Sequence, residues 1–138
     1  MNNAGFARRL FSIVYESFLG FSVIFTGSLA YILTLGPPAS ITQVLAFRFS
    51  LLVILGCYLI PQWALLGQTL AMKTWRIRLE TESGKNLSIT RATLRYLAAW
   101  VSFVSLGLGF LWALADKDGQ FLHDRICGTR VVVMIASP

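Results

Sequence analysis

The chain has 138 residues, of which 56% are hydrophobic and 13% are charged. Soluble domains carry about 25% charged residues, so this composition excludes an ordinary soluble domain and predicts that lipid surrounds most of the chain. The net charge of +6 does not point to a nucleic-acid partner, because the basic residues lie beside apolar runs and not on a polar surface. Membrane topology explains the positive charge better.

The first apolar run predicts a membrane-spanning helix over residues 10–35. It follows Arg8 and Arg9, contains a single charge at Glu16, and ends before Gly36-Pro37-Pro38. The run exceeds the ~20 residues that a helix needs to cross a bilayer. A signal peptide is the rival interpretation, but its apolar core would be uncharged and about 7 to 15 residues long. We therefore expect this segment to be retained as the first span.

A second span is predicted over residues 49–66. It follows an uncharged linker over residues 36–47 and opens after Arg48. Its length is near the lower limit for a span. Pro61 lies inside the run, where a membrane helix tolerates proline, and we expect it to kink the end of the helix.

The polar stretch that follows, residues 67–91, predicts a cytoplasmic loop. Half of the twelve Lys and Arg residues fall between residues 67 and 95. They are Lys73, Arg76, Arg78, Lys85, Arg91 and Arg95. Loops rich in Lys and Arg stay on the cytoplasmic side, so the amino terminus is expected there too.

Two local patterns predict structure within this polar stretch. Residues 75–81 alternate between apolar and charged side chains, which is typical of a short strand, and residues 83–86 are turn formers. Ser88 or Thr90 can cap the helix that follows.

Residues 92–115 form a third apolar segment, for which the sequence allows two interpretations. One is a third full span, since the length is sufficient. The other is a re-entrant helical hairpin, in which a helix over residues 91–106 breaks at Gly107-Leu108-Gly109 and a shorter helix turns back.

The polar tail, residues 116–138, bears on that choice. Residues 129–135 are rich in β-branched side chains and predict a second strand, which can pair with residues 75–81. Pairing requires both strands on the cytoplasmic side, which favours the re-entrant hairpin. We predict a single domain over residues 1–138: an all-α membrane protein with two transmembrane helices, a third apolar segment and a short two-stranded cytoplasmic β element.

Several motifs carry a family resemblance. They are Arg8-Arg9, Gly67-Gln68-Thr69, Gly109-Phe-Leu-Trp-Ala-Leu-Ala-Asp116 and Gln120-Phe-Leu-His-Asp124-Arg. On these motifs the chain resembles the RDD family of bacterial membrane proteins, which is named for one arginine and two aspartates. The resemblance implies a multi-pass protein of the bacterial inner membrane.

The same resemblance implies which residues matter. The family arginine falls on Arg9, with Arg8 as its neighbour, and the second aspartate falls on Asp124 or Asp116. Glu16 stands where the family has its first aspartate, so the carboxylate is kept and a methylene group is added.

Glu16 is two helical turns from Arg9 and on the same helix face. It is expected about 10 Å deeper in the membrane, where a carboxylate costs about 2.5–3.5 kcal/mol. Two turns are too far for an ion pair within the helix, so we expect a partner from another segment: Arg95, Lys73 or a tail cation such as Arg125. The carboxylate is then either half of a structural ion pair or a proton or cation site.

No motif predicts catalysis, a metal ion or a cofactor. Asp116-Lys-Asp118-Gly119 lacks the later residues of a calcium loop. His123, Asp124 and Cys127 offer three ligands where a tetrahedral metal site takes four. The lone histidine has no nucleophile-elbow motif near it. We expect no enzyme, no metal and no cofactor, and we expect the tail aspartates and Arg125 to form a polar network.

Two functions remain open. Small residues recur at four-residue spacing, which allows close helix packing in lipid: Ser22, Thr26 and Ala30, and again Ser105, Gly109 and Ala113. This pattern favours a structural or interaction module that forms homo-oligomers or binds other membrane proteins. The alternative is a cation or proton transporter, for example a sodium/proton exchanger, that uses Glu16. It would have to be an oligomer, because two or three spans cannot enclose an aqueous route.

Overall fold

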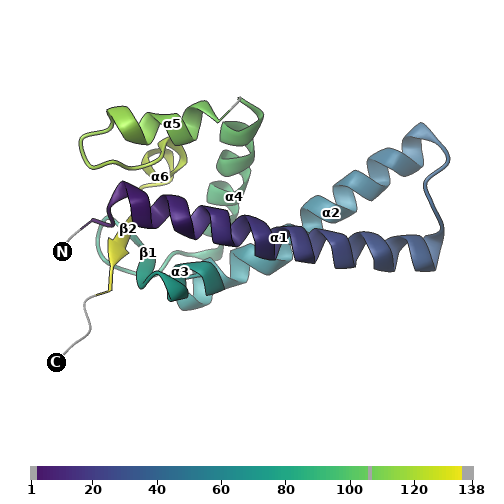
Figure 1. The fold of residues 1–138 in the computed structure, drawn as a ribbon, viewed down its shortest axis with the longest axis horizontal. Coiled ribbons are helices and arrows are strands. Elements are labelled where there is room, and N and C mark those ends of the chain that lie inside the picture. Colours follow the sequence, from purple (N-terminus) through teal and green to yellow (C-terminus); the bar gives the residue numbers. More distant parts are fainter. Residues whose placement is uncertain (1–2, 106, 135–138) are drawn as a thin grey trace.

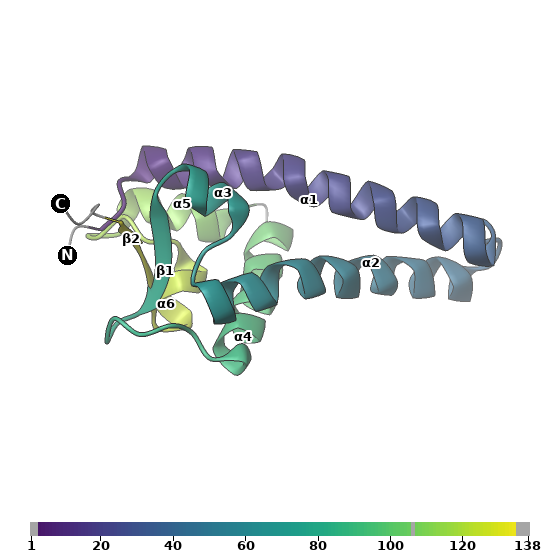
Figure 2. The ribbon, with the colours of Figure 1, turned by 90° about the horizontal axis from the view of Figure 1, so that it is seen from below.

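The computed structural model describes residues 3–105 and 107–134. In it a long helical hairpin projects from a compact cap, which consists of residues 67–88 and 116–134 (Figure 1). The hairpin consists of α1 (Phe6–Leu35) and α2 (Ile41–Pro61), and a π-helical turn, η1 (Gln62–Leu66), continues α2. Figure 2 shows α1 and α2 running alongside each other, Figure 1 shows that they cross at an angle, and in both views their connected ends lie far from the cap. The chain is therefore mostly helical, with two long apolar helices.

Both arms of the hairpin are long and apolar enough to cross a membrane. They contain 30 and 26 residues, which correspond to about 45 and 39 Å of helix against a core of ~30 Å. Gly20 and Gly27 of α1 face Leu55 and Ile54 of α2, so that a side chain on Gly27 would already crowd Ile54. Small residues of this kind let two helices pack closely in lipid.

Both long helices begin before the predicted spans do. α1 begins at Phe6, not at residue 10, so the arginine pair lies inside the helix. The second helix begins at Ile41, not at residue 49, and residues 41–47, which were expected as linker, are helical. Ser40 caps this helix, because its hydroxyl accepts a hydrogen bond of 3.3 Å from the Gln43 backbone N–H. The charge at Arg48 is thus not a helix boundary.

Pro61 is followed by the π-helical turn, which ends at Gly67 with a left-handed φ of 67°.

The predicted cytoplasmic loop over residues 67–91 contains more regular structure than expected. A short helix, α3 (Leu70–Thr74), is capped by Thr69 and precedes the strand β1 (Ile77–Thr81). After a turn, Ser88 caps the helix α4 (Ile89–Val104) by accepting from the Arg91 backbone N–H.

The third apolar segment is not one continuous helix. α4 ends at Val104, Gly107 adopts a left-handed φ of 75°, and α5 (Leu108–Ala115) follows; residue 106 lies outside the described residues. The two helices contain 16 and 8 residues, about 24 and 12 Å, and neither alone reaches across a ~30 Å core. α4 runs across the hairpin, not along it (Figures 1 and 2).

The last described elements are α6 (Leu122–Ile126), which the sequence did not predict, and β2 (Thr129–Val133). β1 and β2 pair antiparallel, from Ile77 opposite Val133 to Thr81 opposite Thr129. These strands lie within the two segments from which strands were expected, although residue 135 lies outside the described residues. At the other end of the chain, the Ala4 N–H donates to the Val131 carbonyl over 3.0 Å. The start of α1 and both strands therefore lie together.

The core of the cap joins the strands to the base of the hairpin and to α4. Its buried residues are Ala4, Trp63, Ala64, Ile77, Leu79, Leu87, Ala92, Tyr96 and Val131. This core ties the polar segments to the ends of the long helices, and it fixes the residues of the site described next.

Candidate functional site

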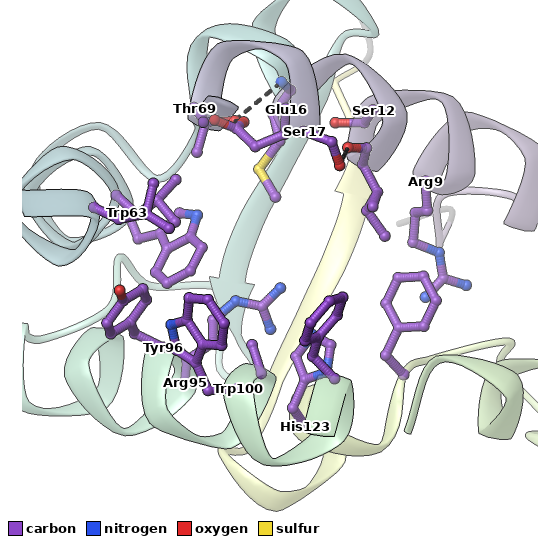
Figure 3. A pocket seen from close by; sticks show the side chains of 18 of the residues that line it. Arg9, Ser12, Glu16, Ser17, Trp63, Thr69, Arg95, Tyr96, Trp100 and His123 are labelled. Atoms are coloured by element: carbon purple, nitrogen blue, oxygen red, sulfur yellow. Dashed lines mark hydrogen bonds between the residues drawn. The ribbon is translucent and has the colours of Figure 1, made fainter. Parts of the chain in front are cut away.

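A cavity of about 440 Å³ lies between α1, η1, α4 and the cap (Figure 3). Two arginines, one glutamate and one histidine line it: Arg9, Arg95, Glu16 and His123. Most of the remaining wall is apolar or aromatic: Ile13, Gly20, Phe21, Ile24, Leu55, Leu59, Trp63, Met72, Ile77, Tyr96, Ala99, Trp100, Phe103, Phe121 and Val131. A few polar groups within a largely apolar wall are typical of a binding pocket.

Glu16 is held by a hydroxyl group and not by a cation. The Thr69 side chain, which also caps α3, donates a hydrogen bond to Oε2 of Glu16. Oε1 is buried and has no hydrogen-bond partner among the described residues. The Tyr58 hydroxyl interacts with Glu16 but does not reach hydrogen-bond geometry. One carboxylate oxygen therefore remains available inside the cavity.

The prediction that a cation pairs with Glu16 is wrong. Arg95 pairs with Asp124 and Arg125 pairs with Asp116, while Lys73 is exposed and makes no ion pair within the described ranges. Arg8 is likewise exposed, at the outer side of α1. The reason is the position of the Gly67-Gln68-Thr69 turn, which brings a hydroxyl to the carboxylate.

Arg9 is 3% exposed and lies at the edge of the cavity. Its Nη2 donates to the Asp118 carbonyl over 3.4 Å, and its guanidinium carbon lies 5.3 Å from the centre of the Phe121 ring. Nε and Nη1 are buried without an acceptor among the described residues. Gly119, with a left-handed φ of 61°, turns beside this group, since a Cβ there would lie 3.0 Å from Nη2.

Arg95 and Asp124 form a fully buried ion pair across α4 and α6, with side chains 5% and 0% exposed. Asp124 Oδ2 also accepts from the Phe121 backbone N–H over 3.3 Å, which caps α6. Arg95 lies over the Trp63 ring, 5.2 Å from its centre, and its Nε has no acceptor in the described part of the chain. Asp124 therefore lies behind Arg95, which forms part of the cavity wall.

His123 lies beside this pair. Its Nε2 is 3.7 Å from Asp124 Oδ1, and its ring stacks on Phe121 with 5.5 Å between centres. Burial and the positive charge of Arg95 lower the pKa of His123 to about 2. The imidazole is therefore neutral near pH 7 and contributes a polar but uncharged face to the cavity.

Asp116 lies outside the cavity and closes the turn between α5 and α6. Arg125 Nε donates to Asp116 Oδ1 over 2.9 Å, and Arg125 Nη2 donates to Asp118 Oδ2 over 2.8 Å. The Arg125 guanidinium and the backbone N–H of Gln120 lower the pKa of Asp116 to about 2. The predicted tail network is thus two separate units, one around Arg125 and one around Arg95.

Arg9 and Glu16 therefore line one cavity and Asp124 holds the Arg95 side chain in its wall, at positions that carried the family resemblance. The sequence model of the RDD family matches residues 3–128. The chain belongs to the RDD family. No curated protein and no solved structure matches it.

Several residues of this RDD-family cavity were missed by sequence reasoning. Thr69 was noted only as part of a motif, and Trp63, Phe121 and His123 were not expected beside the arginines. The spacing of residues along a helix face gives no signal for such contacts, because they join segments far apart in the chain. Among the described residues, no three His, Cys, Asp or Glu side chains are placed to hold a metal ion.

Proposed function

We propose that this RDD-family protein is a structural or interaction module of the bacterial inner membrane that associates with copies of itself or with other membrane proteins. The observation that carries the proposal is the hairpin, which extends beyond the cap and leaves most of its apolar surface uncovered. Lipid can cover such a surface, and so can another helix.

One face of α1 suits a partner helix. Ser22, Thr26 and Ala30 are exposed, whereas Gly20 and Gly27 make the contact with α2. The Thr26 hydroxyl donates to the Ser22 carbonyl of its own helix over 2.9 Å, so this face carries little free hydrogen-bonding capacity. A second helix can approach closely along such small side chains.

The proposed orientation places the cap and both termini in the cytoplasm. Cations gather on the cap, in β1, in the turn after it and at the start of α4, which follows the positive-inside rule. The third apolar segment is proposed to enter the bilayer from that side and return to it. Support comes from the break at Gly107, from the length of α5, and from the pairing of β1 with β2.

Energy transfer between labelled copies in vesicles tests self-association. Maleimide dyes on Cys127, in a Cys57→Ser background, should give energy transfer that persists as lipid is added in excess. Ala30→Leu should reduce the signal, because it thickens the small-residue face. Ala46→Leu is the matched control, since Ala46 is exposed on α2. Self-association would be excluded if, in the Cys57→Ser chain without further substitution, dilution with lipid lowered energy transfer to the level of randomly distributed labels.

A second candidate, cation or proton transport by an oligomer, rests on Glu16. It is a carboxylate inside an apolar helix, and its Oε1 has no partner among the described residues while facing a cavity. Carboxylates at such positions are typical of proton and ion sites. Proton-coupled sodium flux into vesicles would be measured for the native chain and for Glu16→Gln. Equal flux in both would remove Glu16 from the mechanism, and no flux in either would leave the interaction module.

A further inference from the structure

Two buried arginines present unused hydrogen-bond donors to the cavity. Arg9 and Arg95 are 3% and 4% exposed. Arg9 Nε and Nη1 and Arg95 Nε have no acceptor among the described residues, and both side chains line the cavity. Figure 3 shows the guanidinium of Arg95 within the pocket and Arg9 at its edge. Buried charged donors without acceptors are costly, so an occupant that supplies acceptors stabilises this arrangement.

Arg9 is the cation at this end of the cavity that lacks a direct ion-pair partner. Asp124 neutralises Arg95 directly, whereas Arg9 has no carboxylate within ion-pair distance in the described residues; Asp116 acts on Arg9 only from a longer distance and is itself paired with Arg125. The polar contact that Arg9 makes is with a backbone carbonyl, at 3.4 Å. Glu16 points to Thr69 on the opposite side of the cavity from Arg95 (Figure 3).

The rest of the cavity suits a hydrocarbon chain. Ile24, Leu55 and Phe103 line it beyond the arginines. Phe21 and Phe103 also line it while being 68% and 66% exposed, so they lie at its mouth, on an apolar surface that lipid can cover. A molecule can therefore enter sideways from the bilayer.

We propose that this cavity binds an anionic phospholipid, with its phosphate between Arg9 and Arg95 and one acyl chain along Ile24, Leu55 and Phe103. Guanidinium groups bind phosphate oxygens through paired, charge-assisted hydrogen bonds. Basic pockets between membrane helices take up anionic headgroups, and the volume lies within the range of ligand pockets. The proposal concerns a ligand and does not depend on self-association or transport.

The cavity contains its own reporters for a test. Trp63 and Trp100 line it, whereas Trp75 and Trp112 do not. In a chain with Trp75→Phe and Trp112→Phe, phosphatidylglycerol with brominated acyl chains should quench fluorescence at about tenfold lower mole fraction than brominated phosphatidylcholine. Equal quenching by the two lipids would overturn the proposal.

Two substitutions locate the site, and a third is the control. Arg9→Gln should abolish the preference for phosphatidylglycerol, while Arg8→Gln, which removes the same charge from the exposed neighbouring position, should keep it. Ala99→Phe should also abolish the preference by filling the cavity without changing any charge. Circular dichroism establishes that each variant is folded. A preference retained in both folded Arg9→Gln and folded Ala99→Phe would contradict the proposal.

A competition experiment distinguishes a lipid from a free anion. Inorganic phosphate should not displace brominated phosphatidylglycerol beyond the effect of sodium chloride at the same ionic strength, because phosphate makes no contact with the apolar wall. Displacement by phosphate alone would assign the site to a soluble anion and overturn the lipid assignment.

Discussion

At the scale of single residues, the buried ion pair of Arg95 and Asp124 leads to the clearest prediction about stability. Removing one member of a buried ion pair leaves the other charge without compensation, which costs about 3–5 kcal/mol. We predict a loss of that size for Asp124→Ala in denaturant unfolding of the detergent-solubilised protein. Asp118→Ala is the control, since its side chain is 49% exposed and its loss should cost less than about 1 kcal/mol.

The double variant Arg95→Met/Asp124→Leu separates charge from packing. It should be more stable than Asp124→Ala, because two apolar side chains of similar size leave no buried charge. A double variant that is less stable than the single one would contradict this, and would show that Arg95 keeps stabilising contacts, such as that with the Trp63 ring, after its partner is lost.

The burial of His123 leads us to expect that the free energy of unfolding depends on pH. Its pKa falls from 6.5 in the unfolded chain to about 2 in the fold, so between these values the unfolded chain binds a proton that the folded chain does not. The free energy of unfolding should therefore decrease as the pH falls below 6.5, by at most ~1.4 kcal/mol per pH unit. Thermal unfolding from about pH 7 to about pH 5 measures this above the range where carboxylates titrate. His123→Asn should flatten the dependence, and an unchanged slope would contradict the assignment.

At the scale of elements, the crossing of α4 and α5 depends on Gly109. A Cβ at this position would lie 2.5 Å from the Ser102 Cβ, closer than two such atoms approach. We expect Gly109→Ala to destabilise the fold by about 1–3 kcal/mol through overpacking. Ser102→Gly in the same chain should recover part of this loss. Gly5→Ala is the control, because a Cβ there meets nothing within 4 Å; equal effects of the two alanines would exclude the close crossing.

At the scale of the whole molecule, the pairing of β1 with β2 bears on topology. β1 follows the second long helix and β2 follows the third apolar segment, and this pairing supports the proposal that the segment returns to the side from which it started. A membrane-impermeant maleimide should leave Cys127 unlabelled in intact cells and label it in opened cells, whereas Cys57 should stay protected by lipid in both. Labelling of Cys127 from outside would contradict the cytoplasmic cap.

The sequence by itself determined the features that depend on local composition and period. Apolar length predicted two long helices, alternation and β-branching indicated the segments that pair as strands, and Gly107 marked the break before α5. The motifs also identified the family. The start of the second helix was placed less accurately, because the cap at Ser40, and not the charge at Arg48, sets where that helix begins.

Only the tertiary structure decided which polar groups meet. Thr69 and Glu16 are 53 residues apart, and Arg95 and Asp124 are 29 residues apart. Periodicity specifies which face of a helix a side chain occupies, but not which segment packs against that face. The cavity exists for the same reason, since it forms between four parts of the chain whose mutual position depends on the packing of the cap against the hairpin.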